Sequence, residues 1–194
     1  GGANLSVEDR IRAHVRLAQA VQKLGQLQDA LAYAEKALAI LGSRFPASRL
    51  GILFALASEL GGLAWSSLGR LWPGPRPTPT DTDLLQDDAL QVLVECHFHL
   101  GHSWQRTVAM AWVMRRLEHH GTLEKRSLGH AALALLLHHR GLHPIADGYM
   151  HWAILELEGL PETAETCEAQ FLIAHVHGNR DRYGLAIDRF RSTR

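Results

Sequence analysis

The sequence of 194 residues predicts an all-α fold, a right-handed α-solenoid in which antiparallel helical hairpins are stacked. Residues 101–118 and 141–158 match each other with a period of about 40 residues. The matched pairs are Gly101 with Gly141, Met110 with Met150, Trp112 with Trp152, Leu117 with Leu157, Glu118 with Glu158, Leu93 with Leu133 and His99 with His139. Self-similarity at such a period is typical of helical repeat proteins, in which each hairpin buries its apolar face against the next.

The composition favours a folded chain without a membrane span or a nucleic-acid partner. Apolar residues make up 46% of the chain, enough for a continuous core, and the 20 basic residues balance the 20 acidic ones. The longest apolar run, 131–137, is far shorter than the roughly 20 residues that a spanning helix needs. No signal peptide pattern opens the chain. We expect a soluble, cytoplasmic protein.

The two cysteines, Cys96 and Cys167, lie within helical patterns and are far apart in the sequence. We interpret them as reduced thiols of the core or of a groove, as in a cytosolic protein, and not as a disulfide. The absence of an initiating methionine suggests a fragment of a larger protein.

The first predicted hairpin covers residues 7–42. Ser6, followed three residues later by Asp9, is a variant of the N-terminal capping box. Gly25 and Gly42 end its two helices. Small residues on one face of the second helix, at Ala30, Ala34 and Ala37, would allow the two helices to pack closely.

An extra helix is predicted over residues 47–72, weakened or kinked at the pair Gly61–Gly62. Its apolar composition fits a buried core helix, and an interaction surface for a partner or membrane interface is the alternative. Residues 73–83 are rich in proline and predict an extended surface loop, a linker or a proline-motif ligand. Asp81 or Asp83 could cap the helix that follows.

Three further hairpins are predicted, over residues 84–120, 125–160 and 163–194. Gly101 and Gly141 mark the turns of the first two, and residues 178–181 the turn of the last. Pro144 suits the first turn of a helix. All four hairpins, the extra helix and the loop are expected to form a single repeat domain over residues 1–194.

The first and third hairpins resemble the tetratricopeptide repeat. The residues that carry the resemblance are Leu17, Ala18, Val21, Gly25, Ala30, Ala34 and Ala37 in the first hairpin, and Leu133, Ala134, Leu137, Gly141, Ala146, Met150, Ala153 and Pro161 in the third. The second departs at Arg106, where that family has a small alanine. The last keeps Ile173, Ala174, Ala186 and Phe190 but has Asp181 in place of the turn glycine. The period exceeds the usual 34 residues by about six.

A second resemblance covers most of the chain. Residues 37–60, then the proline-rich break and the hairpins, are similar to the helical repeat region of large bacterial regulators built on an AAA/STAND-type ATPase and often linked to a class III nucleotide cyclase or a kinase. No Walker A loop, cyclase metal aspartates or kinase motif occurs in the chain. The resemblance therefore implies a signalling, regulatory segment without catalytic residues, whose parent protein carries any active site elsewhere.

Histidines recur at the ends of the first helices of three hairpins. The pairs are His97 and His99, His138 and His139, and His175 and His177. We interpret them as helix C-terminal and surface residues, with a pH-responsive or metal-binding ridge as alternatives. Residues i and i+2 point to different faces of a helix, which argues against chelation by His97 with His99 or His175 with His177. His99 with His102 stays open, although no zinc-ligand spacing occurs.

No nucleophile with a base, no carboxylate pair and no phosphate-binding loop stands out, so we expect no enzyme, cofactor or metal in this chain. The local basic cluster Arg115, Arg116, Lys125 and Arg126 is diluted by acidic neighbours. The sequence predicts a protein–protein interaction or signal-sensing module with a concave groove for a peptide or partner domain. The predicted groove residues are Gln19, Gln22, Gln91, Glu95, His99, Leu135, His138 and His175. Alternatives are a histidine-rich metal-binding or pH-sensing protein, or a structural solenoid that self-associates into a homodimer through exposed array ends.

Overall fold

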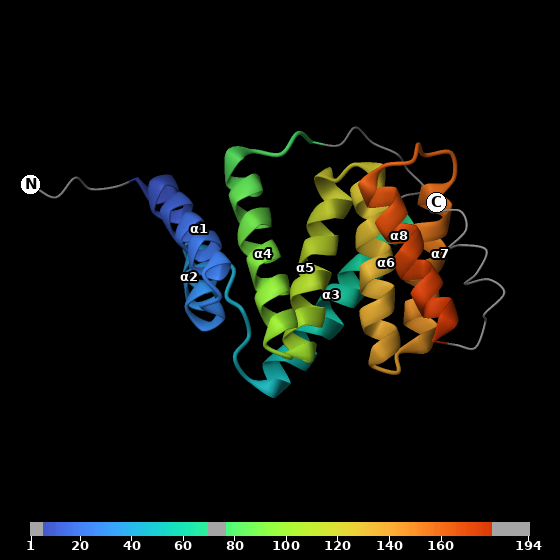
Figure 1. Ribbon diagram of the computed structural model, residues 1–194, viewed down its shortest axis with the longest axis horizontal. Helices are drawn as coiled ribbons and strands as arrows, with labels where there is room; N and C mark the ends of the chain where they lie inside the picture. The colour runs from blue at the N-terminus through green and yellow to red at the C-terminus, as the bar shows by residue number, and fades with distance from the viewer. Residues whose placement is uncertain (1–5, 70–76, 180–194) are drawn as a thin grey trace, which may run out of the picture. The chain divides into compact units, whose positions relative to one another are not determined.

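The computed structural model describes residues 6–69 and 77–179, and within these all regular elements are α-helices (Figure 1). The helices are α1 (Val7–Lys23), α2 (Leu27–Ile40), α3 (Arg49–Gly69), α4 (Asp81–His99), α5 (Ser103–His120), α6 (Leu123–His139), α7 (His143–Leu157) and α8 (Ala164–Gly178). The predicted all-α class is confirmed. The solenoid with its 40-residue period stays a prediction.

The chain divides into two compact units, Gly1–Val113 and Met114–Arg194, with the boundary inside α5. In unit 1, α1 and α2 pack against each other, and α4 packs against both of them. Ala30, Ala34 and Ala37 are completely buried, which lets the neighbouring helices approach closely. Leu38, Leu90 and Leu93 fill the core between them. The close packing that these small residues predict for the first hairpin is therefore present in the structure.

Helix α3 has one buried and one exposed face. It begins at Arg49, where the Ser48 hydroxyl accepts a hydrogen bond of 3.0 Å from the backbone N–H of Gly51. Ile52, Leu56 and Leu63 are buried, whereas Leu50, Leu53 and Phe54 are exposed. The helix continues through Gly61 and Gly62. The buried face fits the interpretation as a core helix, and an interaction surface on the exposed face stays a prediction.

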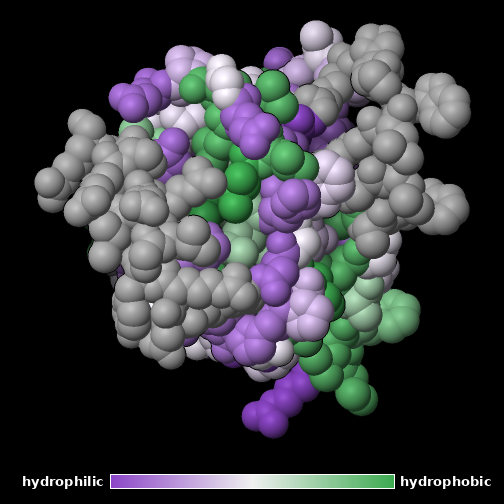
Figure 2. Space-filling model, turned by 90° about the vertical axis from the view of Figure 1, so that its right-hand side faces the viewer, coloured by the Kyte–Doolittle hydropathy of each residue, from purple (hydrophilic) through white to green (hydrophobic). Residues whose placement is uncertain are grey.

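In unit 2, α6 packs against α7 and α8, and α7 also contacts α8. The apolar residues that meet in this core are Leu133, Ala134, Leu137, Ala146, Met150, Ala153, Ile173 and Ala174. Met150 is buried and packs in this core. On the face of the molecule in Figure 2, hydrophobic residues gather in patches between hydrophilic ones.

The helix ends follow side-chain and glycine signals in the sequence. The hydroxyls of Ser6, Thr80, Thr122 and Thr163 cap α1, α4, α6 and α8 by accepting hydrogen bonds from backbone N–H groups. The expectation that Asp81 or Asp83 caps α4 is wrong, because Thr80 is the cap and Asp83 completes its capping box. Helix α4 consequently starts three residues before the predicted position 84.

Several other boundaries differ slightly from those predicted. Helix α7 starts at His143 with Pro144 in its first turn, as expected, but ends at Leu157, before a glycine of positive φ at Gly159. Residues 180–194 of the last predicted hairpin, residues 70–72 of the predicted extra helix and residues 73–76 of the proline-rich loop lie outside the described residues. No helix in the described part of the chain is long and apolar enough to cross a membrane.

Candidate functional site

Three of the predicted groove residues meet on the surface of unit 1. The Gln22 side chain of α1 donates a hydrogen bond of 2.5 Å to one carboxylate oxygen of Glu95 on α4. Gln91, one turn before Glu95, donates a bond of 3.0 Å to the other oxygen. Gln91 and Glu95 are exposed, and Gln22 is half-buried. The two first helices thus share an exposed carboxamide–carboxylate cluster, here called the amide cluster.

The other predicted groove residues are not joined in the same way. Gln19 on α1 is half-buried, and His99 is exposed at the end of α4. In unit 2, Leu135 and His138 are half-buried on α6, and His175 is exposed on α8. The His175 ring lies 6.2 Å from that of His139 and 6.5 Å from that of Phe171, measured between centroids. Of the predicted groove residues, the structure joins Gln22, Gln91 and Glu95 by hydrogen bonds.

Two histidine pairs form across helix C-terminal turns. His97 and His102 in unit 1 have Nδ1 atoms 3.3 Å apart, and His138 and His143 in unit 2 have Nδ1 atoms 3.0 Å apart. In each pair one ring nitrogen donates and the other accepts, so at least one ring is neutral. Among the described residues, no three histidine, cysteine, aspartate or glutamate side chains are placed to hold a metal ion.

His97 is the buried member of the first pair. Its ring lies 5.2 Å from that of Phe45, and its Nε2 atom is buried with no hydrogen-bond partner among the described residues. Burial, and secondly the charge of His102, lowers the pKa of His97 from 6.5 to about 4. His97 is therefore a neutral packing residue at physiological pH.

The two cysteines are free thiols, as the sequence predicts. Cys96 is buried in the core of unit 1. Burial, followed by the charge of Glu95, raises the pKa of the Cys96 thiol to about 11. Because the thiolate is the reactive form of cysteine, Cys96 is a packing residue and not a nucleophile.

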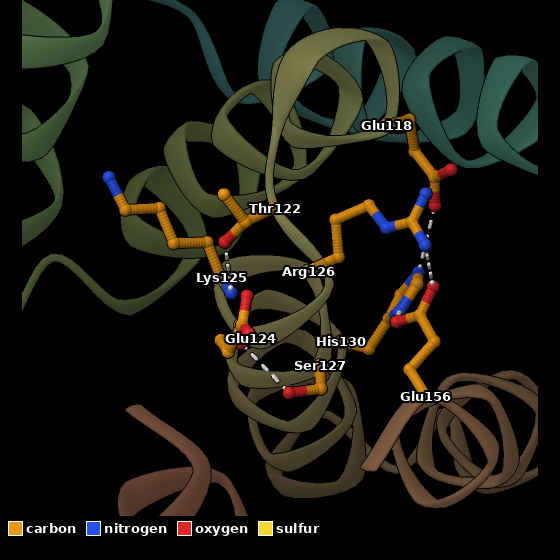
Figure 3. Close-up of polar contacts among 8 residues, drawn as sticks. All are labelled: Glu118, Thr122, Glu124, Lys125, Arg126, Ser127, His130 and Glu156. Atoms are coloured by element: carbon orange, nitrogen blue, oxygen red, sulfur yellow. Dashed lines mark hydrogen bonds and ion pairs between the residues drawn. The ribbon is translucent and has the colours of Figure 1, made fainter. Parts of the chain in front are cut away.

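Unit 2 contains a buried cluster of four charged side chains, here called the charge quartet (Figure 3). His130 on α6 lies between two carboxylates: its Nδ1 is 2.7 Å from Glu156 on α7, and its Nε2 is 2.9 Å from Glu118 on α5. Arg126, one turn before His130, contacts the other oxygen of Glu156 at 3.1 Å. Only 1% of the His130 side chain is exposed.

The geometry of the charge quartet suits an imidazolium at His130. A neutral imidazole has one N–H, so His130 can donate to both Glu118 and Glu156 only as the imidazolium, the form that fits two ionised carboxylates. Two carboxylates, one imidazolium and one guanidinium then sum to zero charge. A buried set of charges is tolerated only when it is paired and hydrogen-bonded in this way.

The charge quartet can hold helices together, but it offers no route to a substrate. All four side chains are almost completely buried, since each is at most 8% exposed. The ring of Tyr149 on α7 lies 5.9 Å from that of His130 and adds an apolar contact. The quartet joins α5, α6 and α7, and we interpret it as a structural element.

Sequence reasoning missed the charge quartet. Arg126 was grouped with other basic residues in a local cluster, whereas its side chain is buried in the quartet with that of Glu118. The spacing of Arg126 and His130, i and i+4 on the apolar face of α6, was the available signal. Glu118 and Glu156 could not have been paired with them, because they come from other helices.

Comparison of the chain with protein families, with curated proteins and with solved structures finds no match.

Proposed function

We propose that this chain is a non-catalytic helical-repeat module that binds a peptide or a partner domain, with the amide cluster as part of its binding surface. The observation that carries the proposal is the hydrogen-bonded set of Gln22, Gln91 and Glu95, which spans the first helices of two hairpins. The packing of α4 against both α1 and α2, and of α8 against both α6 and α7, supports stacked hairpins.

The chemistry of the amide cluster suits an extended peptide. Each carboxamide that donates one N–H to Glu95 keeps a second N–H and its carbonyl oxygen, so it can donate to and accept from a peptide backbone. The Glu95 carboxylate adds a site for a basic side chain or an N–H donor. We expect the bound segment to be neutral or basic, held by backbone contacts.

The resemblance to bacterial regulators extends this proposal to the parent protein. The module would receive a protein signal and pass the change to an ATPase, cyclase or kinase domain of a larger chain. This regulatory role is a proposal that rests on apolar patterns of the sequence.

A displayed library of random peptides of about twelve residues tests the binding surface. We expect the chain to enrich peptides whose affinity, measured by fluorescence anisotropy, falls about tenfold or more in the triple variant Gln22→Ala, Gln91→Ala, Glu95→Ala. Gln28→Ala with Glu35→Ala is the matched control, since it removes the same residue types from exposed positions of α2. The proposal is refuted if no selected peptide distinguishes the triple variant from the control.

A further inference from the structure

We propose that unit 1 has a second docking surface, at the start of α3, that binds an acidic, hydrophobic peptide segment of a partner protein. It consists of Leu50, Leu53 and Phe54 on the exposed face of α3 and of the pocket beside them. This surface is separate from the amide cluster, and the proposal does not depend on the function proposed above.

A pocket of about 500 Å³ lies between the first turn of α3 and the beginning of α5. Figure 1 shows the start of α3 beside the turn that joins α4 to α5. Arg49, Ile52 and Leu53 line the pocket on one side, and His102, Ser103 and Trp104 line it on the other. Its size is in the range of pockets that hold a large side chain or a small ligand.

The rim of this pocket exposes an unusual amount of apolar surface. Leu50 is 80% exposed, Phe54 78% and Leu53 50%. These residues are spaced i, i+3 and i+4, so they form one stripe along the helix. Trp104 is also exposed and lines the pocket from α5. Clustered exposed hydrophobic residues around a concave site are typical of protein interaction surfaces.

The charges at the pocket favour a partner segment of negative charge. Arg49 lines the pocket and makes no ion pair with a described residue, and none of the described lining residues is acidic. The first turns of α3 and α5 carry no acidic residue either. A carboxylate brought to this site would meet the Arg49 guanidinium, and no acidic residue among the described lining residues would repel it. An apolar side chain beside it would fill the space between Leu53 and Trp104.

The peptide library used for the amide cluster also tests this surface. We expect a second class of enriched peptides, with Asp or Glu next to a large apolar residue. Their affinity should fall about tenfold or more in Arg49→Glu, which removes the contact for the carboxylate, and in Leu53→Asp, which removes a contact for the apolar side chain. Both residues are at the surface, so these variants should keep the far-ultraviolet circular dichroism spectrum of the wild type. Arg16→Glu, an exposed arginine of α1, is the control and should leave the affinity unchanged.

Three results would overturn the proposal. They are enriched peptides without carboxylates, acidic peptides that bind Arg49→Glu as tightly as wild type, or peptides that all keep their affinity in both Arg49→Glu and Leu53→Asp. A concentration-dependent dimer that Phe54→Ser dissociates would also overturn it, by assigning the surface to a second copy of the chain. If the enriched peptides lose affinity only in the triple variant of the amide cluster, the first binding surface is supported and the second is refuted.

Discussion

His130 shows how one side chain can determine the electrostatics of a helical core. Both of its ring nitrogens face carboxylates, and Arg126 neutralises the remaining charge. Breaking a buried ion pair by removing one partner is much more costly than replacing the whole set with apolar residues. Removing one member of the charge quartet should therefore destabilise unit 2 strongly. Replacing all four members with apolar residues should destabilise it less.

Replacing His130 with leucine should lower the free energy of unfolding by about 3–5 kcal/mol, because two buried carboxylates would share a single cation. Chemical denaturation with urea measures this loss. The combined variant Glu118→Leu, Arg126→Met, His130→Leu, Glu156→Leu should lose less than His130→Leu alone. A loss below about 1 kcal/mol for His130→Leu would show that the quartet is not coupled as its distances indicate.

The low pKa of His97 predicts a loss of stability in acid. The folded-state pKa of about 4 lies below the unfolded value of 6.5, so the unfolded chain binds the proton first as the pH falls. The contribution of neutral His97 is complete above pH 6.5 and is lost progressively toward pH 4. Between pH 7.5 and pH 5 this amounts to about 2 kcal/mol.

His97→Leu should remove this part of the pH dependence, measured as the difference between urea unfolding free energies at pH 7.5 and pH 5. Leucine is the natural replacement, because Leu137 stands 40 residues later at the equivalent place. His151→Leu, which removes an exposed histidine of α7, should keep the wild-type dependence. An unchanged dependence in His97→Leu would exclude His97 as its source.

At the scale of the element, the turns between helices are specified by glycine and by hydrogen bonds to the preceding helix. Gly101 and Gly141 have φ values of +70° and +75°. At the same turns, the backbone N–H of His102 donates to the carbonyl of His97, and that of Leu142 to the carbonyl of Leu137. This is the Schellman arrangement, in which the residues at its two ends also touch through their side chains. The His97–His102 pair occupies those positions in unit 1.

Two glycines of unit 2 provide a matched test of this turn. An added Cβ would meet nothing within 4 Å at either Gly141 or Gly148, so only the backbone distinguishes them. Gly141→Ala should destabilise the protein by about 1–2 kcal/mol, because alanine is strained at positive φ. Gly148→Ala, inside α7, should stabilise it by about 0.5–1 kcal/mol. Thermal unfolding measures both, and equal shifts would contradict the explanation.

Arg106 shows how a departure from the repeat pattern is accommodated. The resemblance to the tetratricopeptide repeat places a small residue there, but the arginine extends over the ring of Phe98, 4.3 Å from its centroid. Burial lowers the pKa of Arg106 from its usual value, yet the guanidinium keeps a favourable contact with the aromatic face. The second hairpin can therefore form with a residue that the pattern does not anticipate.

At the scale of the whole chain, local signals predicted the elements well. The ends of α1 and α2 were located from glycine turns, alanine faces and a serine cap, and the start of α7 from Pro144. Each of these signals acts within a few residues of sequence. The start of α4 was misplaced because Asp83 serves both capping and helix formation, which sequence alone does not separate.

The polar sites were harder to predict than the helices. Gln22, Gln91 and Glu95 were assigned to one surface because neighbouring first helices place them in register, and the structure joins them. The charge quartet and the pocket at Arg49 depend on contacts between helices that are distant in sequence. Hydrophobic periodicity specifies which face of a helix is buried, but it does not specify which charged residue meets which.

The charge quartet has a consequence for how unit 2 folds. Glu118 and Glu156 lie in the last turns of α5 and α7, and Arg126 lies in the first turn of α6. Each charge has the sign that its own helix macrodipole disfavours, so each of the three helices is weakened when it forms alone. This unfavourable interaction of each charge with its helix macrodipole is offset only when all three helices are assembled, because the negative charges at the ends of α5 and α7 then contact the positive charges of α6. Assembly of these helices should therefore be cooperative, with few partly formed states in which one helix is docked without the others.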